Sequence, residues 1–221
     1  GTNFVRGLLD ATKPKTFADL LIISGLSHGT DVWAGNAEKL IADGICDLRG
    51  VIGCRDDIMM YLSSMGVEPL LAFKIMEDVR KGRKVSAEYE KVMKEHNVPQ
   101  YYIDSCNKIK YMFPKAHATA YVMMAIRVGW YKVYRPLEFY ATFFTVRSKQ
   151  YDLQAMIDGE RAIIARLQEF QERKAGKGEP LSPKEGEIEK TLTIALEMVE
   201  RGYRCENISL YDSLATAFKV N

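Results

Sequence analysis

Cysteine and histidine, the usual ligands of structural zinc, are few in this 221-residue chain, and none is spaced like a zinc site. The four cysteines, Cys46, Cys54, Cys106 and Cys205, form no C-x-x-C pair, and only three histidines are present. Structural zinc ions are usually held by closely spaced cysteine or histidine pairs. We therefore expect no metal or other cofactor in this chain, and reduced, mostly buried thiols typical of a cytoplasmic protein.

Long apolar runs and a charge excess are missing too. The longest apolar runs, residues 20–23 and 121–126, are too short to span a membrane, so no membrane partner is expected. Lys and Arg number 31 against 29 Asp and Glu, and a net charge of +2 does not by itself indicate a nucleic-acid-binding protein. The first residues contain no secretory signal and are typical of the interior of a longer protein.

Alternating strand patterns are almost absent, and helical periodicity dominates the chain. Proline, glycine and capping residues set the expected ends of the helices. We expect helices over residues 16–23, 30–42, 56–64, 69–80, 86–95, 99–111, 114–133, 137–147, 151–171 and 187–201. A short alternation around Ile208 and Leu210 favours a strand. The pattern predicts an all-α fold with a small irregular or β C-terminal tail.

The best linker or mobile loop in the sequence is residues 173–187, which are rich in charge, glycine and proline. This composition divides the chain into a helical core over residues 1–172, the linker at 173–187, and a C-terminal helix and tail over residues 188–221.

The most informative motif is YMFPKAHATAY, residues 111–121. Pro114 favours a helix start, so Lys115 would lie beside unpaired backbone N–H groups that attract anions. His117 and Tyr121 are four residues apart and share a helix face, which suits a stacked base. The ordinary alternative is a core helix in which these residues only pack, and the residue types alone favour that alternative.

A second motif is VIGCRDDI, residues 51–58. Arg55 follows a glycine turn and has the guanidinium geometry that grips phosphate. Asp56 and Asp57 resemble a metal-binding pair, but adjacent helical residues point about 100° apart, which makes a poor chelate. The favoured interpretation is that both aspartates stabilise the first turn of a helix.

A third motif is SGLSHGTDVW, residues 24–33, in which Ser24, Ser27 and His28 are expected in a glycine-flanked loop. Ser27 beside His28 has the residue types of a hydrolase nucleophile and base, but no third, orienting residue is evident. A capping loop ending at Thr30 or Asp31 explains the motif without catalysis.

A basic run, Arg80-Lys81-Gly82-Arg83-Lys84, follows the helix expected at residues 69–80. Runs of this kind are most often solvated surface. The alternative is contact with DNA or nucleotide phosphates, helped by the pliable Gly82.

These motifs, in this order and together with LAFKIM (residues 71–76) and YIDSCNK (102–108), resemble the fingers of the PolC-type DNA polymerase III alpha subunit, a C-family bacterial replicase. The resemblance covers nearly the whole chain and is loosest over residues 173–187. It implies a helical fingers domain, with primer–template DNA, deoxynucleoside triphosphates, and the palm and thumb of the same polymerase as partners.

The resemblance also implies what the chain lacks. In this family Mg²⁺ is expected on palm aspartates, and no palm-like segment is present. A helix-hairpin-helix that follows the fingers is expected beyond Asn221. We therefore expect a fragment of a nucleotidyltransferase, without catalytic residues of its own and inactive alone.

Site roles follow from the resemblance. Arg55 and Lys115 are expected to contact triphosphate, and Phe113, His117 and Tyr121 to form a wall against the nascent base pair. Ser24 and Ser27 are expected near that pocket, and Arg80, Lys81, Arg83 and Lys84 near DNA. The alternative function is a helical protein-interaction scaffold with no ligand of its own.

Overall fold

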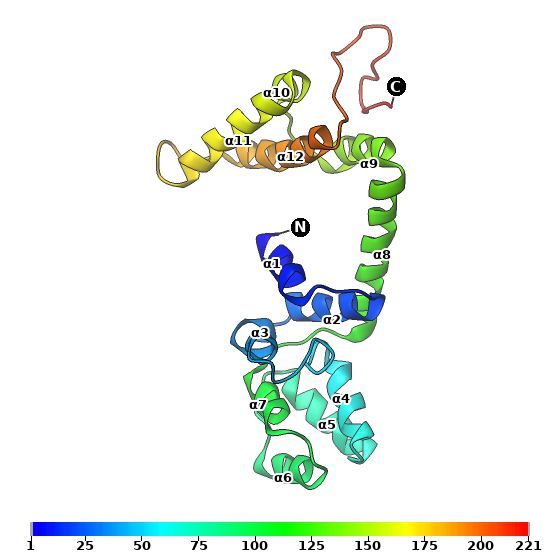
Figure 1. The fold of residues 1–221 in the computed structure, drawn as a ribbon, viewed down its shortest axis with the longest axis vertical. Coiled ribbons are helices and arrows are strands. Elements are labelled where there is room, and N and C mark those ends of the chain that lie inside the picture. The colour runs from blue at the N-terminus through cyan, green and yellow to red at the C-terminus, as the bar shows by residue number, and fades with distance from the viewer. Residues whose placement is uncertain (1, 221) are drawn as a thin grey trace. The chain divides into compact units, whose positions relative to one another are not determined.

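The computed structural model describes residues 2–220, and its regular structure is helical (Figure 1). The elements are α1 (Asn3–Thr12), α2 (Phe17–His28), the kinked segment η1 (Trp33–Ala37), α3 (Glu38–Ala42), α4 (Arg55–Ser64), α5 (Pro69–Val79), α6 (Ala87–Glu95), α7 (Gln100–Lys108), α8 (Lys115–Tyr134), α9 (Pro136–Thr142), the π-helical η2 (Phe143–Arg147), α10 (Leu153–Asp158), α11 (Glu160–Lys174) and α12 (Pro183–Glu200). Ala34 and Gly35 have non-helical backbone angles, so η1 is a kink and not a regular helix. Residues 2–220 contain no β-strand, so the all-α class is confirmed.

The C-terminal tail after α12 is irregular. The alternation at Ile208 and Leu210 forms no strand there, and the two side chains are 66% and 96% exposed. A strand needs a neighbouring strand to pair its backbone groups, and the described part of the chain supplies none. The β option for the tail was therefore wrong, and the irregular option was right.

Helix α2 runs further than its sequence predicted. The expected end at Ser24 is wrong, because the helix continues to His28 and carries Ser24 and Ser27 in its last turns. Gly25 makes this possible, since an added Cβ there would lie 2.1 Å from the carbonyl oxygen of Gly53. The missing side chain lets the helix pass directly against the loop that leads to α4.

The chain divides into two compact units, Gly1–Ile126 and Arg127–Asn221, and the division falls within α8. Residues 173–187, the expected linker, include the end of α11 and the start of α12. Arg173 bridges this turn by donating to the Glu179 carbonyl (2.9 Å) and to Glu185 (2.7 Å). The segment connects two helices inside the second unit.

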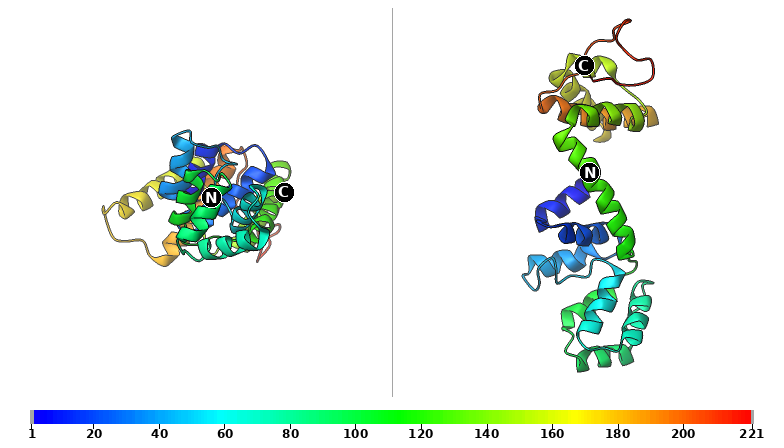
Figure 2. Two further views of the ribbon diagram at one scale, coloured as in Figure 1. Left: turned by 90° about the horizontal axis from the view of Figure 1, so that it is seen from below. Right: turned by 90° about the vertical axis from the view of Figure 1, so that its right-hand side faces the viewer.

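The first unit is built around the helical hairpin of α4 and α5, which lie side by side (Figures 1 and 2). Ile58 and Leu62 of α4 and Ile75 of α5 are fully buried. Tyr102 of α7 closes this core and stacks on Tyr61, with ring centroids 4.2 Å apart. Burying each such aliphatic side chain contributes about 1.5–3 kcal/mol.

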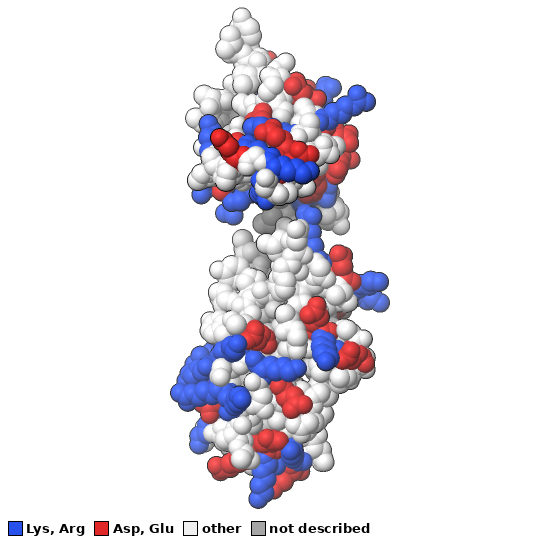
Figure 3. Space-filling model, turned by 90° about the vertical axis from the view of Figure 1, so that its left-hand side faces the viewer, with Lys and Arg blue, Asp and Glu red and all other residues white. Residues whose placement is uncertain are grey.

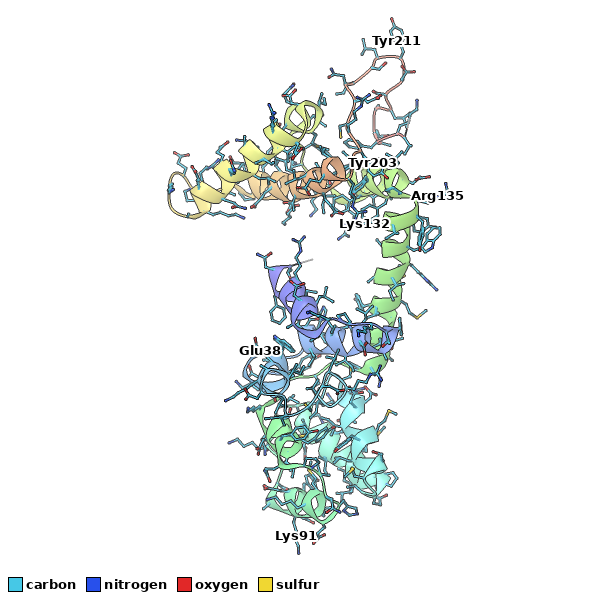
Figure 4. The ribbon with its side chains drawn as sticks, in the orientation of Figure 1. Glu38, Lys91, Lys132, Arg135, Tyr203 and Tyr211 are labelled. Atoms are coloured by element: carbon cyan, nitrogen blue, oxygen red, sulfur yellow. The ribbon has the colours of Figure 1, made fainter. Side chains whose placement is uncertain are left out.

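The second unit packs α9, η2 and α10 with α11 and α12 around Tyr140, Phe144 and Phe170. The helix expected over residues 151–171 is broken at Gly159, whose φ of 87° separates α10 from α11. Tyr203, labelled in Figure 4, places its ring 6.2 Å from that of Tyr140. No helix within residues 2–220 is long and apolar enough to cross a membrane.

Candidate functional site

The three sequence motifs meet at the start of α8. The backbone N–H of Thr30, just beyond α2, donates to the carbonyl of Tyr111 (2.9 Å), and the N–H of Lys110 donates back to Thr30 (3.0 Å). The N–H of Arg55, the first residue of α4, donates to the carbonyl of Phe113 (3.1 Å). The segment before α8 is therefore held between the end of α2 and the start of α4.

An aromatic column, Phe113, His117 and Tyr121, runs along the first turns of α8. The Phe113 and His117 rings stack with centroids 5.0 Å apart and planes 15° apart. His117 and Tyr121 follow at 4.6 Å. Phe113 lies outside the helix, as a residue before proline should, but its ring still continues the column.

The column is on the surface of the first unit. Tyr121 is 63% exposed and His117 is exposed, whereas the buried side chains of α8 are Ala118 and Val122. The aromatic face therefore points away from the face that packs on the core. This exposure leaves flat ring surface available to a ligand, which a fully packed core helix would not.

Two further rings border the column. His28 meets Phe113 edge-on at 5.6 Å, and Tyr111 meets it edge-on at 5.5 Å. The role of these two rings was missed from the sequence. His28 reaches Phe113 only because the chain brings α2 beside the start of α8, and no local signal in either motif indicates that contact.

The two serines of α2 lie behind His28. The Nδ1 atom of His28 is 2.8 Å from both the Ser24 carbonyl and the Ser27 hydroxyl. The Ser27 hydroxyl also donates to that carbonyl, at 3.0 Å. The three groups hold the imidazole at the end of α2, and no third residue among those described orients it as a hydrolase triad requires.

Lys115 is already paired at the tip of α8. Its ammonium donates to Asp57 (2.9 Å) and its backbone N–H to Asp56 (2.6 Å). The hydrogen bond to Asp57 raises the pKa of Lys115. Asp57 also accepts from the backbone N–H of Cys54 (2.8 Å) at the start of α4. An anion approaching this helix tip must compete with two carboxylates.

Asp57 thus accepts a backbone hydrogen bond at the N-terminus of α4, and Asp56 accepts one at the N-terminus of α8. A negative charge is favourable at both positions. This engagement does not fit a Mg²⁺ pair, and no cluster of three or more His, Cys, Asp or Glu suited to a metal ion occurs within residues 2–220. The neighbouring Cys54 is buried, and burial raises the pKa of its thiol to about 12, so it is a neutral packing group.

Arg55 differs from Lys115 in having no acidic partner. Its Nε is buried and makes no hydrogen bond, and within residues 2–220 its guanidinium has no ion pair. The backbone N–H of Arg55 donates to the carbonyl of Phe113, so the two residues are joined through their main chains. A guanidinium without an acidic partner among the described residues has the geometry to grip a phosphate.

The basic run at residues 80–84 is largely neutralised by acids of α5. Arg80 donates to Glu77 (2.7 Å), Lys81 lies 3.1 Å from Glu77, and Arg83 lies 3.0 Å from Asp78. The Arg80 hydrogen bond lowers the pKa of Glu77 to about 2. Figure 3 likewise shows basic and acidic groups interspersed on the face that it draws.

Lys84 is the member of this run without an ion pair among the described residues. Gly82 brings the run against the segment before α8, because an added Cβ there would lie 2.8 Å from the carbonyl oxygen of Lys110. The basic run therefore packs against the backbone segment that leads into the aromatic column.

Comparison with known proteins identifies the chain. Residues 1–99 match a sequence family described as the bacterial DNA polymerase III alpha subunit finger domain. The whole chain is 57% identical over 220 residues to DNA polymerase III PolC-type of Oceanobacillus iheyensis and 55% identical over 221 residues to that of Bacillus subtilis. It is 53% identical over 226 aligned positions to the Streptococcus sanguinis protein of the same name.

The chain spans 15% of the length of each of these relatives. The chain belongs to the PolC-type DNA polymerase III family and corresponds to its fingers region.

Proposed function

We propose that this chain holds the incoming deoxynucleoside triphosphate and the nascent base pair in a replicative DNA-directed DNA polymerase. The observation that supports this most directly is the aromatic column of Phe113, His117 and Tyr121. It is joined through the Phe113 carbonyl to the backbone of Arg55, which has no ion pair among residues 2–220. The substrates would be nucleotides and primer–template DNA, in the cytoplasm, and the palm and thumb of the same polypeptide would complete the site.

In this proposal the aromatic rings bind the base and the cationic side chains bind the triphosphate. The rings stack on a base or base pair, which is worth about 1–3 kcal/mol per base in single-strand binders. Arg55 meets the triphosphate first, since it has no partner to give up. Lys115 joins by exchanging Asp57 for a phosphate oxygen, and the released Asp57 keeps its bond to Cys54.

Ser24 and Ser27 act through His28 in this proposal. The Ser24 carbonyl and the Ser27 hydroxyl each lie 2.8 Å from Nδ1 and so orient the imidazole, which meets Phe113 edge-on at the border of the column. Arg80, Lys81, Arg83 and Lys84 follow the DNA backbone, Lys84 directly and the other three after leaving Glu77 or Asp78. Metal-assisted phosphoryl transfer belongs to palm residues outside this chain.

The test is nucleotide binding by a whole polymerase that contains this chain, with primed DNA at low salt. Arg55→Ala should weaken nucleotide binding about 10- to 150-fold, the equivalent of one charge-assisted hydrogen bond of about 1.5–3 kcal/mol. Arg204→Ala, which removes a guanidinium from the exposed tail, is the matched control. Unchanged binding in Arg55→Ala would favour the alternative, a helical protein-interaction scaffold.

A further inference from the structure

The C-terminal half of α8 presents large apolar side chains to solvent in the second unit. We define the α8 apolar face as Val128, Trp130, Tyr131, Val133 and Tyr134, which are 50–64% exposed. Trp130 has ring contacts only with Tyr131 and Tyr134, each at 5.2 Å, among the residues that the structure describes. Helix α8 contains no Asp or Glu.

The second unit itself does not cover this face. Its hydrophobic core, and the apolar side chains packed against that core, come from α9 onward and include no residue of α8 among those described. The unit holds α8 through Lys132, whose ammonium lies 2.7 Å from Glu197 and 5.4 Å from the ring centre of Phe139. Figure 4 shows Lys132 at this junction. Val128 is four residues before Lys132 and shares its side of the helix, whereas Trp130, Tyr131, Val133 and Tyr134 lie on the remaining sides.

Such a face requires a cover. A helix that is apolar on nearly all sides belongs in an interior, and contiguous exposed apolar patches mark interfaces. Helix α8 is not apolar enough over its length to span a membrane. Tryptophan, tyrosine and arginine are the residues that dominate protein–protein interfaces, and Arg127 borders this face without an ion pair within residues 2–220.

We propose that the α8 apolar face is an interface with another domain of the same polymerase polypeptide. This chain spans 15% of the length of the PolC-type relatives, so most of such a polypeptide lies outside the matched region and can supply the partner domain. That partner should present an apolar surface with a carboxylate for Arg127, because α8 supplies cations and no acid. The inference rests on the proposed function only in taking the chain as part of such a polymerase.

Hydroxyl-radical footprinting read by mass spectrometry tests the interface. The oxidation of Trp130, Tyr131 and Tyr134 is measured in the 221-residue chain and in the complete polymerase, both without DNA or nucleotide. We expect these side chains to be readily oxidised in the chain and, in the complete polymerase, protected to the level of Trp33, which is only 7% exposed. Equal oxidation in both samples would overturn the proposal.

Other occupants give other footprints, each of which would also overturn it. Protection that arises in the complete polymerase only when DNA is added would assign the face to nucleic acid. Protection in the isolated chain that grows with its concentration would assign it to a second copy. The nucleotide-site proposal is tested separately by Arg55→Ala, so either proposal can fail while the other stands.

A variant adds a second measurement. Trp130→Glu should leave the melting temperature of the isolated chain unchanged and, in the complete polymerase, return Tyr131 and Tyr134 to the oxidation of the isolated chain. Leu70→Glu places the same charge at a similarly exposed site of α5 and should leave that protection intact. Protection that survives Trp130→Glu would remove Trp130 from the interface.

Discussion

The ammonium of Lys115 lies 2.9 Å from Asp57, so it must change partner before it can bind a phosphate. Lys115→Ala in a complete polymerase should weaken nucleotide binding about 10- to 150-fold, from the loss of a charge-assisted hydrogen bond of about 1.5–3 kcal/mol. Asp57→Asn breaks the same ion pair but keeps the ammonium, and should preserve or strengthen binding. If Lys115→Ala and Asp57→Asn lose nucleotide affinity equally, the Lys115–Asp57 ion pair only maintains the structure of the site and Lys115 does not bind phosphate.

The exposure of the aromatic column allows a ligand-binding role to be distinguished from a packing role. Tyr121 is 63% exposed and lies at the open end of the column. Tyr121→Ala should therefore weaken binding of all four nucleotides similarly, by about 1–3 kcal/mol in the stacking range, with little change in melting temperature. Phe113→Ala should mainly change how bulky base analogues are tolerated.

Affinity and thermal stability should be measured on the same column variants, with Tyr102→Ala as the buried control. Tyr102 is in the core and 3% exposed, so its loss should lower the melting temperature. The Tyr121 variant could instead behave like the Tyr102 variant, with a lower melting temperature but unchanged nucleotide affinity per folded molecule. That result would show that the column stabilises the fold and does not bind nucleotide.

At the scale of the elements, two glycines of the second unit have opposite roles. Gly159 has φ 87° at the break between α10 and α11, whereas Gly186 lies inside α12, and an added Cβ at either meets no atom within 4 Å. Gly159→Ala should destabilise by about 1 kcal/mol because alanine disfavours positive φ. Gly186→Ala should stabilise by about 0.5–1 kcal/mol.

Chemical denaturation of the two glycine variants measures both effects in the same chain. Since space is open at both positions, only the backbone conformation distinguishes them. A stabilising Gly159→Ala would mean that α10 and α11 can merge into the single helix that the periodicity of residues 151–171 predicts.

For the whole molecule, we expect a folded chain that does not extend a primer by itself. In the proposed function, the aspartates that bind the catalytic metal ions belong to a palm domain outside these residues. The adjacent Asp56 and Asp57 are engaged at the starts of α8 and α4. Primer extension by the purified chain, in parallel with a mock purification that excludes contaminating polymerase, measures this. Incorporation by the chain and not by the mock sample would contradict it.

Much of the fold follows from local sequence. Pro114 predicts the start of α8 and the PKAHATAY spacing places His117 and Tyr121 on one face, as the structure has them. Helix ends follow proline, glycine and capping residues because those residues act within one turn of the backbone. The same local rules misplace the end of α2, since Gly25 is a close-packing residue there and not a terminator.

The candidate site is a product of tertiary structure. Only the folded chain brings His28 to Phe113, sets Asp56 and Asp57 on the tip of α8, and leaves Arg55 without an acidic partner among residues 2–220. These contacts join residues that are tens of positions apart, and their geometry depends on how α2, α4 and α8 pack. The sequence by itself determined the class of fold, the helix that bears the column and the family. Packing decided which charges are already paired and which rings meet, because no local preference of the backbone encodes a contact between distant segments.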